Sequence, residues 1–428
     1  MLIQTPRGTK DILPEDQKYF QFIQKKVDGQ AEINGFEKID TPIFEYQSLF
    51  THGLGEDSDI VEKEMYQVAR FGQKSEEKEK LILRPEGTAG VVRAYIEHGM
   101  KSWPQPVQLY YFGPMFRYNR PQKGRFRQFW QFGFELIGAE DPASDARLIS
   151  LVYALIKSLK LDDATILVNS IGCKNCRPNI KTGLADFFAK KKTVLCQDCQ
   201  KRASKNPFRI LDCKNESCQK IAKLTPPIID QLCEACQDHF KQVLEFLDEA
   251  EVPYDLDPTL VRGLDYYTRT CFEVVLKSDI RRQNSLGGGG RYDELVKLYG
   301  GNPTPAIGVA FGVERIIDTL KAKNIKPDET EKAQVFIAQL GEKAKKKTIA
   351  LLEIFQNEGI VARAALTKNN LKSQLKNADN LAVPITIIIG QREVMDGTAI
   401  IRDMKGGIQE VVEQEAVLDK IKRKLNIK

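Results

Sequence analysis

The residues that could do chemistry centre on the segment from Tyr110 to Glu135, which is predicted to form two long strands joined by a basic loop. In the second strand side chains alternate, so Gln131, Gly133 and Glu135 share one face while large apolar residues occupy the other. Arg117 lies near the end of the first strand. The loop adds further cations: Arg120, Lys123, Arg125 and Arg127. This pattern suits a cationic or amphoteric small molecule beside a polyphosphate, and a charged hairpin with a solvated outer face is the alternative left open.

The elements before this hairpin must position it. Apolar spacing predicts a helix over residues 14–33 and then a strand interrupted by Pro42. A proline inside a strand belongs at a sheet edge or a bend, where another subunit could pack. Two further strands and a helix with Glu86 and Thr88 in its first turn complete this part. Their ranges are 64–70 and 80–84 around the charged turn QKSEEKEK, and 86–98 for the helix.

The elements after the hairpin change character twice. The predicted elements are a helix over 142–159, a strand over 164–170, strand-like residues 260–276, a glycine turn leading into a helix over 285–301, and a buried strand leading through Gly308 and Gly312 into a helix over 305–320. Residues 321–332 have the composition of a linker. From Ala333 onward, alternating strands and helices predict a separate α/β domain of about 95 residues.

Composition limits the class of protein. At 428 residues the chain is too long for one core and fits two or three domains. An apolar fraction of 42% and a charged fraction of 29% are typical of a soluble globular protein. The chain shows no secretion signal and no stretch apolar enough to span a membrane, which predicts a cytoplasmic location. The net charge of +6 is compatible with a nucleic-acid partner, and the basic C-terminal end fits either such a partner or a solvated helix face.

Five segments occur in a specific order: LRPEGT, MFRYNRPQKGRFRQFWQFGFE, LVRGLDYYTRT, GGGGRYDELV and GVAFGVERI. Together they resemble the histidyl-tRNA synthetases, a family of class II aminoacyl-tRNA synthetases, and the resemblance covers essentially the whole chain. It implies an α+β fold with an antiparallel class II sheet core flanked by helices. The implied domains are the catalytic core over 1–325, an inserted, cysteine-rich and mainly helical domain over 171–250, a linker over 321–332, and an α/β anticodon-binding domain over 333–428.

The resemblance implies a two-step reaction. The carboxylate of L-histidine attacks the α-phosphorus of ATP, giving histidyl-adenylate and pyrophosphate, and the histidyl group then moves to the 3′ end of tRNA(His). Neither step needs a protein nucleophile, so alignment and stabilisation of phosphate charge would supply the catalysis. Mg²⁺ would accompany ATP. The three histidines, His52, His98 and His239, lie outside the motifs and are predicted to be surface or packing residues.

Four arginines would handle ATP and the reacting groups, by the same resemblance. Arg117 would grip the α-phosphate with a bidentate guanidinium. Arg262 would reach the reacting carboxylate and the α-phosphate, where related enzymes use a metal ion, and is the main catalytic candidate. Arg125 would close over the nucleotide, and Arg315 would contact its adenine and γ-phosphate side. Asn119 departs from the class pattern, which has an acid there to contact the adenine amine, although an amide can also accept from that amine.

The resemblance also implies a histidine pocket on the polar face of the hairpin. Glu135 would accept a hydrogen bond from one imidazole nitrogen, and the hydroxyl of Tyr266 or Tyr267 would meet the other. A strand-end carboxylate paired with a loop arginine is the alternative for Glu135. The residues around the α-ammonium would be Glu86, Thr88 and Gln131. The complete implied set is Glu86, Gly87, Thr88, Arg117, Gln131, Glu135, Arg262, Tyr266 and Tyr267, with Gly287 to Gly290 as a backbone floor.

Eight of the nine cysteines lie between residues 171 and 250. They form the pairs Cys173/Cys176, Cys196/Cys199, Cys213/Cys218 and Cys233/Cys236. Nineteen residues separate Cys176 from Cys196, within the span expected between the halves of a four-thiolate zinc site. Because a chain without a secretion signal keeps its thiols reduced, one or two structural Zn²⁺ sites are predicted, with reduced and partly buried cysteines as the alternative. Cys271 lies in an apolar strand and is predicted to be core.

Two other functions fit parts of this pattern. One is the regulatory subunit that shares the synthetase core and partners a histidine-biosynthesis phosphoribosyltransferase. That paralogue typically lacks the C-terminal domain, whereas this chain carries a full domain after residue 330. The other is a tRNA-binding scaffold without chemistry, which the intact arginines disfavour. The resemblance further implies a homodimer through the strand around Pro42, and contact between the insertion and the tRNA acceptor arm.

Overall fold

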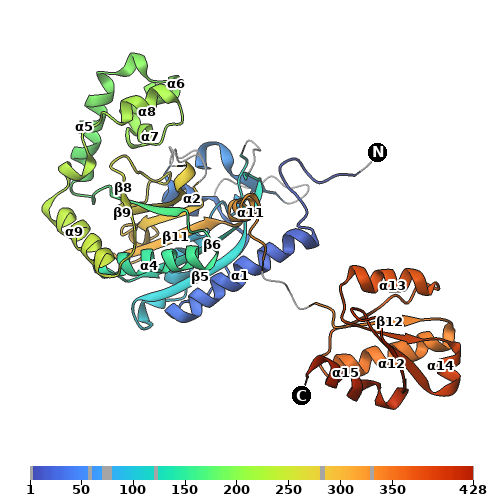
Figure 1. Cartoon of the computed structure of the whole chain (residues 1–428). Helices are drawn as coiled ribbons and strands as arrows, with labels where there is room; N and C mark the ends of the chain where they lie inside the picture. The colour runs from blue at the N-terminus through green and yellow to red at the C-terminus, as the bar shows by residue number, and fades with distance from the viewer. Residues whose placement is uncertain are drawn as a thin grey trace. The chain divides into compact units, whose positions relative to one another are not determined.

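The computed structural model of the chain describes residues 3–55, 60–69, 80–119, 124–279, 285–327 and 332–427. The chain divides into two compact units, Met1–Pro327 and Asp328–Lys428 (Figure 1). Each unit has its own apolar core. The charged turn QKSEEKEK, apart from Lys80, and the loop residues Arg120 and Lys123 lie outside the described residues. Within the described ranges, no helix has the length and apolar character needed to cross a membrane.

An eight-stranded sheet forms the centre of the first unit, in the order β1-β5-β6-β11-β10-β9-β7-β8. Neighbouring strands are antiparallel except in the two edge pairs, β1 with β5 and β7 with β8. The strands are β1 (Glu37–Lys38), β5 (Val107–Phe116), β6 (Gln128–Ile137), β7 (Ala164–Ser170), β8 (Asp255–Leu256), β9 (Thr268–Leu276), β10 (Gly287–Arg291) and β11 (Ala306–Gly312). The predicted α+β class with an antiparallel core sheet is confirmed.

Helices cover one face of this sheet. They are α1 (Pro14–Asn34), α4 (Pro142–Ser158), α9 (Glu234–Glu249) and α11 (Val313–Ala322). Figure 1 shows α1 and α4 running alongside β5 and β6. Their apolar side chains share one core with Phe132 and Phe134, both 0% exposed. Because alternate residues of a strand point to opposite faces, Gln131 and Glu135 point away from these helices, which confirms the predicted alternation of the hairpin strand.

The first unit also contains a small antiparallel sheet, in the order β2-β4-β3. Its elements and their neighbours are β2 (Phe44–Tyr46), α2 (Gln47–Leu54), β3 (Tyr66–Val68), β4 (Leu81–Leu83) and α3 (Thr88–Glu97). The pairing of β3 with β4 confirms the predicted pair of strands. The strand predicted around Pro42 is divided into β1 and β2, and each lies at the edge of its sheet, as the proline requires.

The prediction of a turn at the glycine run was wrong. Residues Gly287–Gly290 belong to β10, which pairs with β9 on one side and β11 on the other. A Cβ at Gly289 would lie 2.0 Å from the carbonyl oxygen of Gly308, so the close approach of these strands requires glycine. The helix α10 (Leu295–Leu298) begins only after Tyr292.

The prediction that residues 260–267 are strand-like was also wrong, because β9 begins at Thr268. These residues form a loop that bends at Gly263–Tyr266. In a strand, the backbone carbonyl groups of this segment would accept hydrogen bonds from a neighbouring strand. Here two of them accept hydrogen bonds from a side chain instead. Nη1 of Arg177 donates to the carbonyl oxygens of Asp265 at 3.2 Å and Tyr267 at 2.5 Å. Within this loop, Arg262, Leu264, Tyr266 and Tyr267 line the cleft described below.

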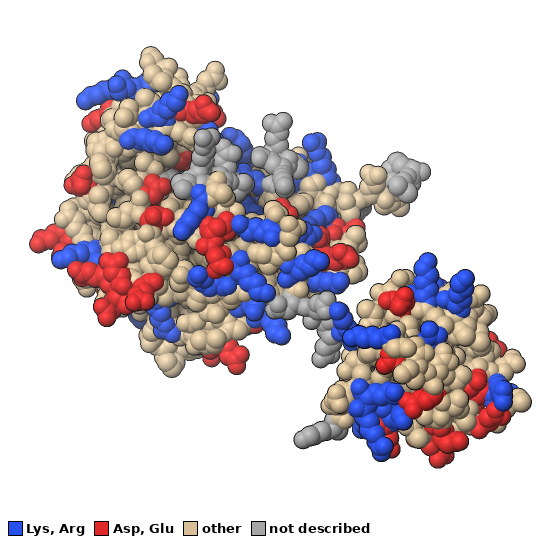
Figure 2. Space-filling model, in the orientation of Figure 1, with Lys and Arg blue, Asp and Glu red and all other residues tan. Residues whose placement is uncertain are grey.

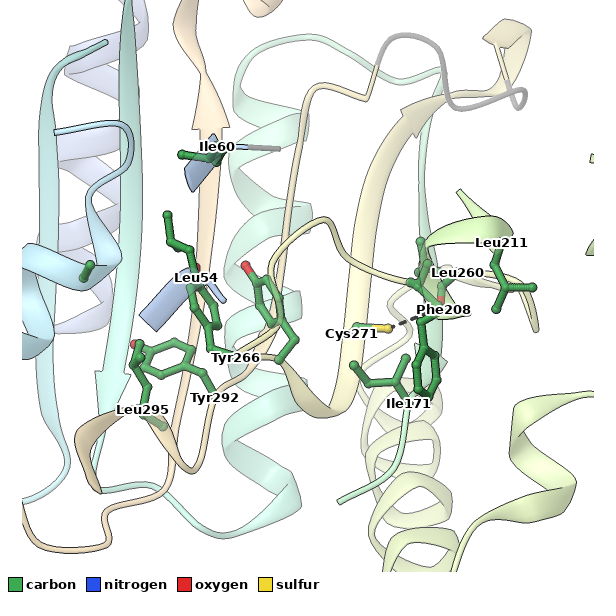
Figure 3. Close-up of a cluster of buried hydrophobic side chains, with 14 of the residues drawn as sticks. Leu54, Ile60, Ile171, Phe208, Leu211, Leu260, Tyr266, Cys271, Tyr292 and Leu295 are labelled. Atoms are coloured by element: carbon green, nitrogen blue, oxygen red, sulfur yellow. Dashed lines mark hydrogen bonds between the residues drawn. The ribbon is translucent and has the colours of Figure 1, made fainter. Parts of the chain in front are cut away.

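Between β7 and β8 the chain forms a helical lobe, which Figure 1 shows extending from the sheet at α5 to α8. Its helices before α9 are α5 (Arg177–Ala189), α6 (Gln197–Lys205), α7 (Phe208–Leu211) and α8 (Glu216–Ala222). Figure 3 shows Phe208 and Leu211 of α7 beside Ile171 and Leu260, in the same buried cluster. In that cluster Cys271 is fully buried, which confirms it as a core residue. The lobe therefore packs against the loop over residues 260–267.

The second unit contains a five-stranded sheet in the order β13-β12-β14-β15-β16. Its elements are β12 (Val335–Gln339), α12 (Glu342–Asn357), β13 (Ala362–Ala364), α13 (Leu371–Asn380), β14 (Ile385–Ile389), α14 (Gln391–Asp396), β15 (Thr398–Asp403), β16 (Gln409–Glu413) and α15 (Val417–Leu425). β16 and α14 were not predicted. Figure 2 shows basic side chains over α15, where Lys420 and Lys424 pair with Glu410 at 2.8 and 2.9 Å.

Candidate active site

The face of the large sheet that carries Gln131 forms the floor of a cleft with a volume of about 390 Å³. The cleft is completed by residues before and in α3, the 260–267 loop, the start of α11 and the helical lobe. The predicted site residues that line it are Glu86, Thr88, Arg117, Asn119, Arg125, Gln131, Arg262, Tyr266, Tyr267, Gly287, Gly288 and Arg315. Gly87 and Glu135 lie outside this lining and contact it through Gln131 and Thr88, respectively.

Glu86 was predicted to lie in the first turn of the helix, but it lies just before the start of α3. One carboxylate oxygen accepts the N–H of Thr88 at 2.8 Å, and the other accepts that of Ala89 at 2.7 Å. The first N–H groups of a helix have no partner within it, so this carboxylate satisfies them. Burial raises the pKa of Glu86, while these N–H groups and Arg117 act to lower it. The helix start therefore holds the carboxylate in one position at the cleft wall.

Glu135 is fully buried behind the cleft and accepts two hydroxyl hydrogen bonds. Thr88 Oγ1 donates to Oε1 at 2.7 Å, and the Tyr292 hydroxyl donates to Oε2 at 2.5 Å. Burial raises the pKa of Glu135 to about 8, although both hydroxyls act to lower it. A Cβ at Gly308, which lies opposite Glu135 on β11, would be 1.7 Å from Oε2. The glycine is thus required for the carboxylate to fit.

Gln131 connects the cleft floor to the start of α3. Its Oε1 accepts the N–H of Gly87 at 3.2 Å and the hydroxyl of Tyr111 at 3.3 Å. These two donors orient the side-chain amide. A Cβ at Gly87 would lie 2.3 Å from the Tyr111 ring, so the predicted Gly87 provides space for that ring. Glycine here supports the pocket wall.

Three tyrosines form the aromatic part of the site. The rings of Tyr266 and Tyr267 have centroids 4.7 Å apart, and Tyr266 packs edge-on against Tyr292 at 5.8 Å. Figure 3 shows Tyr266 and Tyr292 next to each other. Burial raises the pKa of all three hydroxyls, so they remain protonated donors at neutral pH. Only Tyr266 and Tyr267 line the cleft itself.

Arg117, which directly follows β5, and Arg262, in the 260–267 loop, both line the cleft. Arg117 is anchored by its Nε, which donates to the carbonyl oxygen of Pro85 at 2.7 Å. Arg262 donates from Nη1 to Oε1 of Glu273 at 2.8 Å. Its Nε is buried with no hydrogen-bond partner among the described residues. A buried guanidinium N–H without a partner is costly, and an anionic ligand would satisfy it.

Three further cations, Arg125, Lys214 and Arg315, line the cleft. Nη1 of Arg315 donates to the carbonyl oxygen of Ser285 at 2.6 Å. Burial, with Arg125 and Arg117 nearby, lowers the pKa of Arg315 to about 10. Burial and the guanidinium groups of Arg125 and Arg315 also lower the pKa of Lys214, which comes from the helical lobe. Burial is the largest cause of both shifts, and repulsion between neighbouring positive charges adds to it. A polyphosphate would relieve that repulsion.

The sequence interpretation missed several residues of this site. Tyr292 is the second residue after the glycine run in GGGGRYDELV, and its place in that motif was the available signal. Glu273, the partner of Arg262, lies on β9 at the strand's alternating spacing, but nothing local distinguished it. Tyr111 was treated only as part of a strand. Lys214 lies within the pair Cys213/Cys218, a segment that was interpreted only as a metal-binding pattern.

A buried ion pair fastens the glycine strand to the helical layer. Arg291 and Asp145 are both 0% exposed, with Nη2 and Oδ1 2.7 Å apart. His239 Nε2 lies 2.9 Å from Oδ2 of the same carboxylate. The predicted packing role of His239 fits this position, which is behind the sheet, while His52 and His98 are exposed.

The eight cysteines of the lobe form two separate clusters. The basal cluster, where the chain leaves and re-enters the sheet, contains Cys173, Cys176, Cys233 and Cys236, and the distal cluster contains Cys196, Cys199, Cys213 and Cys218. In each cluster the four sulfur atoms lie within 4.8 Å of one another and could hold a metal ion. The nineteen-residue spacing was compatible with a site shared by Cys173/Cys176 and Cys196/Cys199, but the structure places these pairs in different clusters. The helices of the lobe bring the first and last cysteine pairs of the insertion together. The two middle pairs, which lie between them in the sequence, form the second cluster.

The fold and this cleft define an aminoacyl-tRNA ligase of class II. A family model for histidyl-tRNA synthetase matches residues 8–316, and one for an anticodon binding domain matches residues 334–424. The chain belongs to the histidyl-tRNA synthetase family.

Individual relatives agree over the full length. A histidine–tRNA ligase from Desulforamulus reducens is 45% identical over 412 residues, which cover 96% of this chain and 97% of that protein. One from Caldicellulosiruptor saccharolyticus is 44% identical, covering 99% of this chain and 100% of that protein. A crystal structure of apo histidyl-tRNA synthetase from S. aureus matches with a TM-score of 0.81 and 36% identity, covering 98% of this chain and 100% of that one.

Proposed function

We propose that this chain activates L-histidine with ATP and transfers the histidyl group to the 3′ end of tRNA(His). The observation that carries the proposal is the division of one cleft into two chemical sides. Acids and phenols gather around Glu86 and Glu135, and cations gather around Arg117 and Arg315. An amino acid with a basic ring suits the first side, and a polyphosphate suits the second.

The acidic side would bind histidine at both ends. Glu86 and Gln131 would hold the α-ammonium, with Thr88 beside them. Glu135 would accept a hydrogen bond from one imidazole nitrogen, since each of its oxygens accepts one hydroxyl and has a second lone pair. A hydroxyl of Tyr266 or Tyr267 would meet the other nitrogen. A site built from buried polar groups rejects analogues that cannot pair with them, because those groups are then left unsatisfied.

The cationic side would align ATP for attack by the histidine carboxylate. Arg117 and Arg262 would contact the α-phosphate and the carboxylate, so that the two reacting groups meet between two fixed guanidinium groups. Negative charge grows on the phosphate oxygens during attack, and these arginines would stabilise it. Arg125 and Arg315 would contact the rest of the nucleotide. Mg²⁺ would enter with ATP and neutralise part of its phosphate charge.

The second step and the assembly are part of the proposal. The C-terminal unit would bind the anticodon, and the helical lobe would contact the acceptor arm of tRNA(His). Phe44 and Tyr46 of edge strand β2 are 53% and 57% exposed, which supports a homodimer through this edge. Light scattering at micromolar concentration is expected to give twice the chain mass. A monomer mass alone would rule out the homodimer.

We also propose that each cysteine cluster holds one structural Zn²⁺. Four sulfur atoms placed tetrahedrally around zinc are separated by about 3.8 Å. The closest pairs here are separated by 3.8 to 3.9 Å, too long for disulfides and right for a shared ion. Thiolates of this kind need a reducing compartment, and we propose the cytoplasm. Elemental analysis is expected to find about two zinc per chain, and less than about 0.2 would refute the sites.

The experiment that tests the activity is amino-acid-dependent exchange between ATP and pyrophosphate, without tRNA, across all twenty amino acids. Exchange with histidine alone would support both the activation step and the imidazole pocket. A folded protein that exchanges with no amino acid in the presence of Mg²⁺ would contradict the proposal and favour the regulatory paralogue.

A further inference from the structure

One residue of the distal cysteine cluster, Cys213, has neighbours in the sequence that line the cleft. Cys213 belongs to that cluster, and the residues on either side of it, Asp212 and Lys214, both line the cleft. Arg209, one turn earlier on α7, lines it as well. The helical lobe thus supplies charged side chains to a site whose other walls come from the sheet and its loops.

Two different devices hold this part of the lobe. Helix α7 is held by apolar packing, since Phe208 and Leu211 lie against Ile171 and Leu260 (Figure 3). Beyond α7, the residues Asp212, Lys214 and Asn215 are exposed, and Cys213 is the residue that joins this segment to the core. The position of Lys214 therefore depends on what holds the Cys213 sulfur.

The Cys213 sulfur lies within 4.8 Å of the other three sulfur atoms of the distal cluster, so the four surround one point where an ion could bind. Sγ of Cys213 lies 3.9 Å from Sγ of Cys196, and the backbone N–H of Asn215 points at the Cys213 sulfur at 3.5 Å. The backbone N–H of Cys196 points at the sulfur of Cys218 at 3.2 Å. N–H groups directed at sulfur stabilise the negative charge of thiolates that bind metal. An ion at this point would tie the segment between α7 and α8 to α6.

We propose that a metal ion in the distal cluster fixes the segment 212–215 so that Lys214 binds the terminal phosphates of ATP. This inference rests on the proposed ATP-dependent function and adds to it a substrate-binding role for the lobe. Lys214 lines the same cleft as Arg125 and Arg315 and lies close enough to interact electrostatically with both. A compact ammonium group at the cleft rim suits the mobile end of a polyphosphate.

The basal cluster provides an internal contrast. Arg177 follows Cys176 and donates to the carbonyl oxygens of Asp265 and Tyr267. That cluster therefore supports the loop of Tyr266 and Tyr267, which belongs to the histidine side. Loss of the distal ion is expected to weaken ATP binding specifically, because the basal cluster and its loop are left in place.

The test compares zinc content and the two Michaelis constants in histidine-dependent pyrophosphate exchange. Lys214→Ala is expected to raise KM for ATP about fivefold, the effect of one lost contact to phosphate at an exposed rim, with histidine KM and two zinc unchanged. Cys196→Ser is expected to bind one zinc and to raise KM for ATP similarly. The double variant is expected to be no worse than Lys214→Ala, because both changes remove the same contact. Lys223→Ala, an exposed lysine of the same lobe, is the matched control.

The outcomes separate the inference from the proposed function. An unchanged KM for ATP in Lys214→Ala, or in Cys196→Ser with one zinc lost, would overturn the inference while leaving the exchange activity in place. A wild-type protein without histidine-dependent exchange would overturn the proposed function itself. Should Cys196→Ser fail to fold, partial removal of zinc from the folded wild-type protein by a chelator, followed by the same two KM values, replaces it.

Discussion

The two sides of the cleft differ in how their charged groups are held before any ligand arrives. On the acidic side, Glu86 caps a helix and Glu135 accepts two hydroxyls, so each carboxylate already has protein partners. On the cationic side, positive groups stand close together, and burial with neighbouring guanidinium groups lowers the pKa of Arg315. Hydrogen-bonded acids make the first side rigid, whereas repulsion between cations leaves the second side incomplete until an anion binds.

This difference separates recognition from catalysis. A rigid polar pocket discriminates between amino acids, because a wrong side chain leaves buried partners unpaired. A set of cations awaiting an anion stabilises charge that develops on phosphate during the reaction. Variants on the acidic side are therefore expected to change the response to histidine, and variants on the cationic side the chemical step and the response to ATP.

The largest effect is expected from Glu135→Gln. The substitution keeps the shape but replaces an acceptor oxygen with an NH₂ group, which cannot accept from the imidazole or from both hydroxyls. We expect kcat/KM for histidine to fall about 10³-fold with KM for ATP nearly unchanged. Pyrophosphate exchange at varied histidine and ATP measures both. A loss smaller than about tenfold would remove Glu135 from recognition.

The next largest effect is expected from Arg262→Ala on the opposite side. Arg262 is held by Glu273 and has a buried Nε without a partner among the described residues, so its loss removes charge stabilisation at the reacting centre. Adenylate formation is expected to slow at least about 10²-fold, with the melting temperature within a few degrees of wild type. An unchanged rate would exclude it from the mechanism. The matched variant Glu273→Gln, which keeps the arginine but not its anchor, is expected to lose less.

A smaller effect is expected from Tyr292→Phe. The substitution removes the hydroxyl that donates to Oε2 of Glu135 and leaves the ring packing against Tyr266. A hydrogen bond to a charged group contributes about 1.5–3 kcal/mol, so kcat/KM for histidine should fall about 10- to 100-fold. Steady-state exchange kinetics measure this. A wild-type value would mean that the hydroxyl has only a packing role.

The free protein is also expected to show a pH dependence of stability. Burial raises the pKa of Glu135 to about 8, far above that of an unfolded glutamate. The folded state therefore retains a proton that the unfolded state releases, and stability should fall as pH rises from about 4.5 to 8. Glu314, whose pKa burial raises to about 7, acts in the same direction. Urea unfolding across this range should show a shallower decline for Glu135→Gln, and an identical slope would contradict the assignment.

Local pattern predicted many of the elements correctly. The helix predicted over 142–159 is Pro142–Ser158, and the strand predicted over 164–170 is Ala164–Ser170. The helix at Pro14–Asn34 has proline and two acids at its start and ends before Gly35 in a left-handed conformation, all visible in the sequence. In these segments propensity, end signals and burial pattern agree, which is the condition under which local prediction succeeds.

The failures have a common cause in contacts between distant residues. Gly287–Gly290 resembles a turn locally, but β9 and β11 on either side make it a strand. Residues 260–267 resemble a strand locally, but Arg177 donates hydrogen bonds to two of their backbone carbonyl groups. The cysteine spacing suggested one pairing, and the path of the lobe produced another. In each case the deciding partner is far away in sequence, where no local pattern can indicate it.

The sequence by itself determined the family, the hairpin with its alternating faces and twelve of the residues that line the cleft. Those features follow from residue identity and from strand periodicity, which act over a few positions. The tertiary structure alone decided that Tyr292 orients Glu135, that Glu273 holds Arg262, that the cysteines nest in two clusters, and that Lys214 reaches the cleft. These are contacts between segments far apart in the chain, and only folding brings such groups within the few ångströms over which hydrogen bonds and metal ligands act.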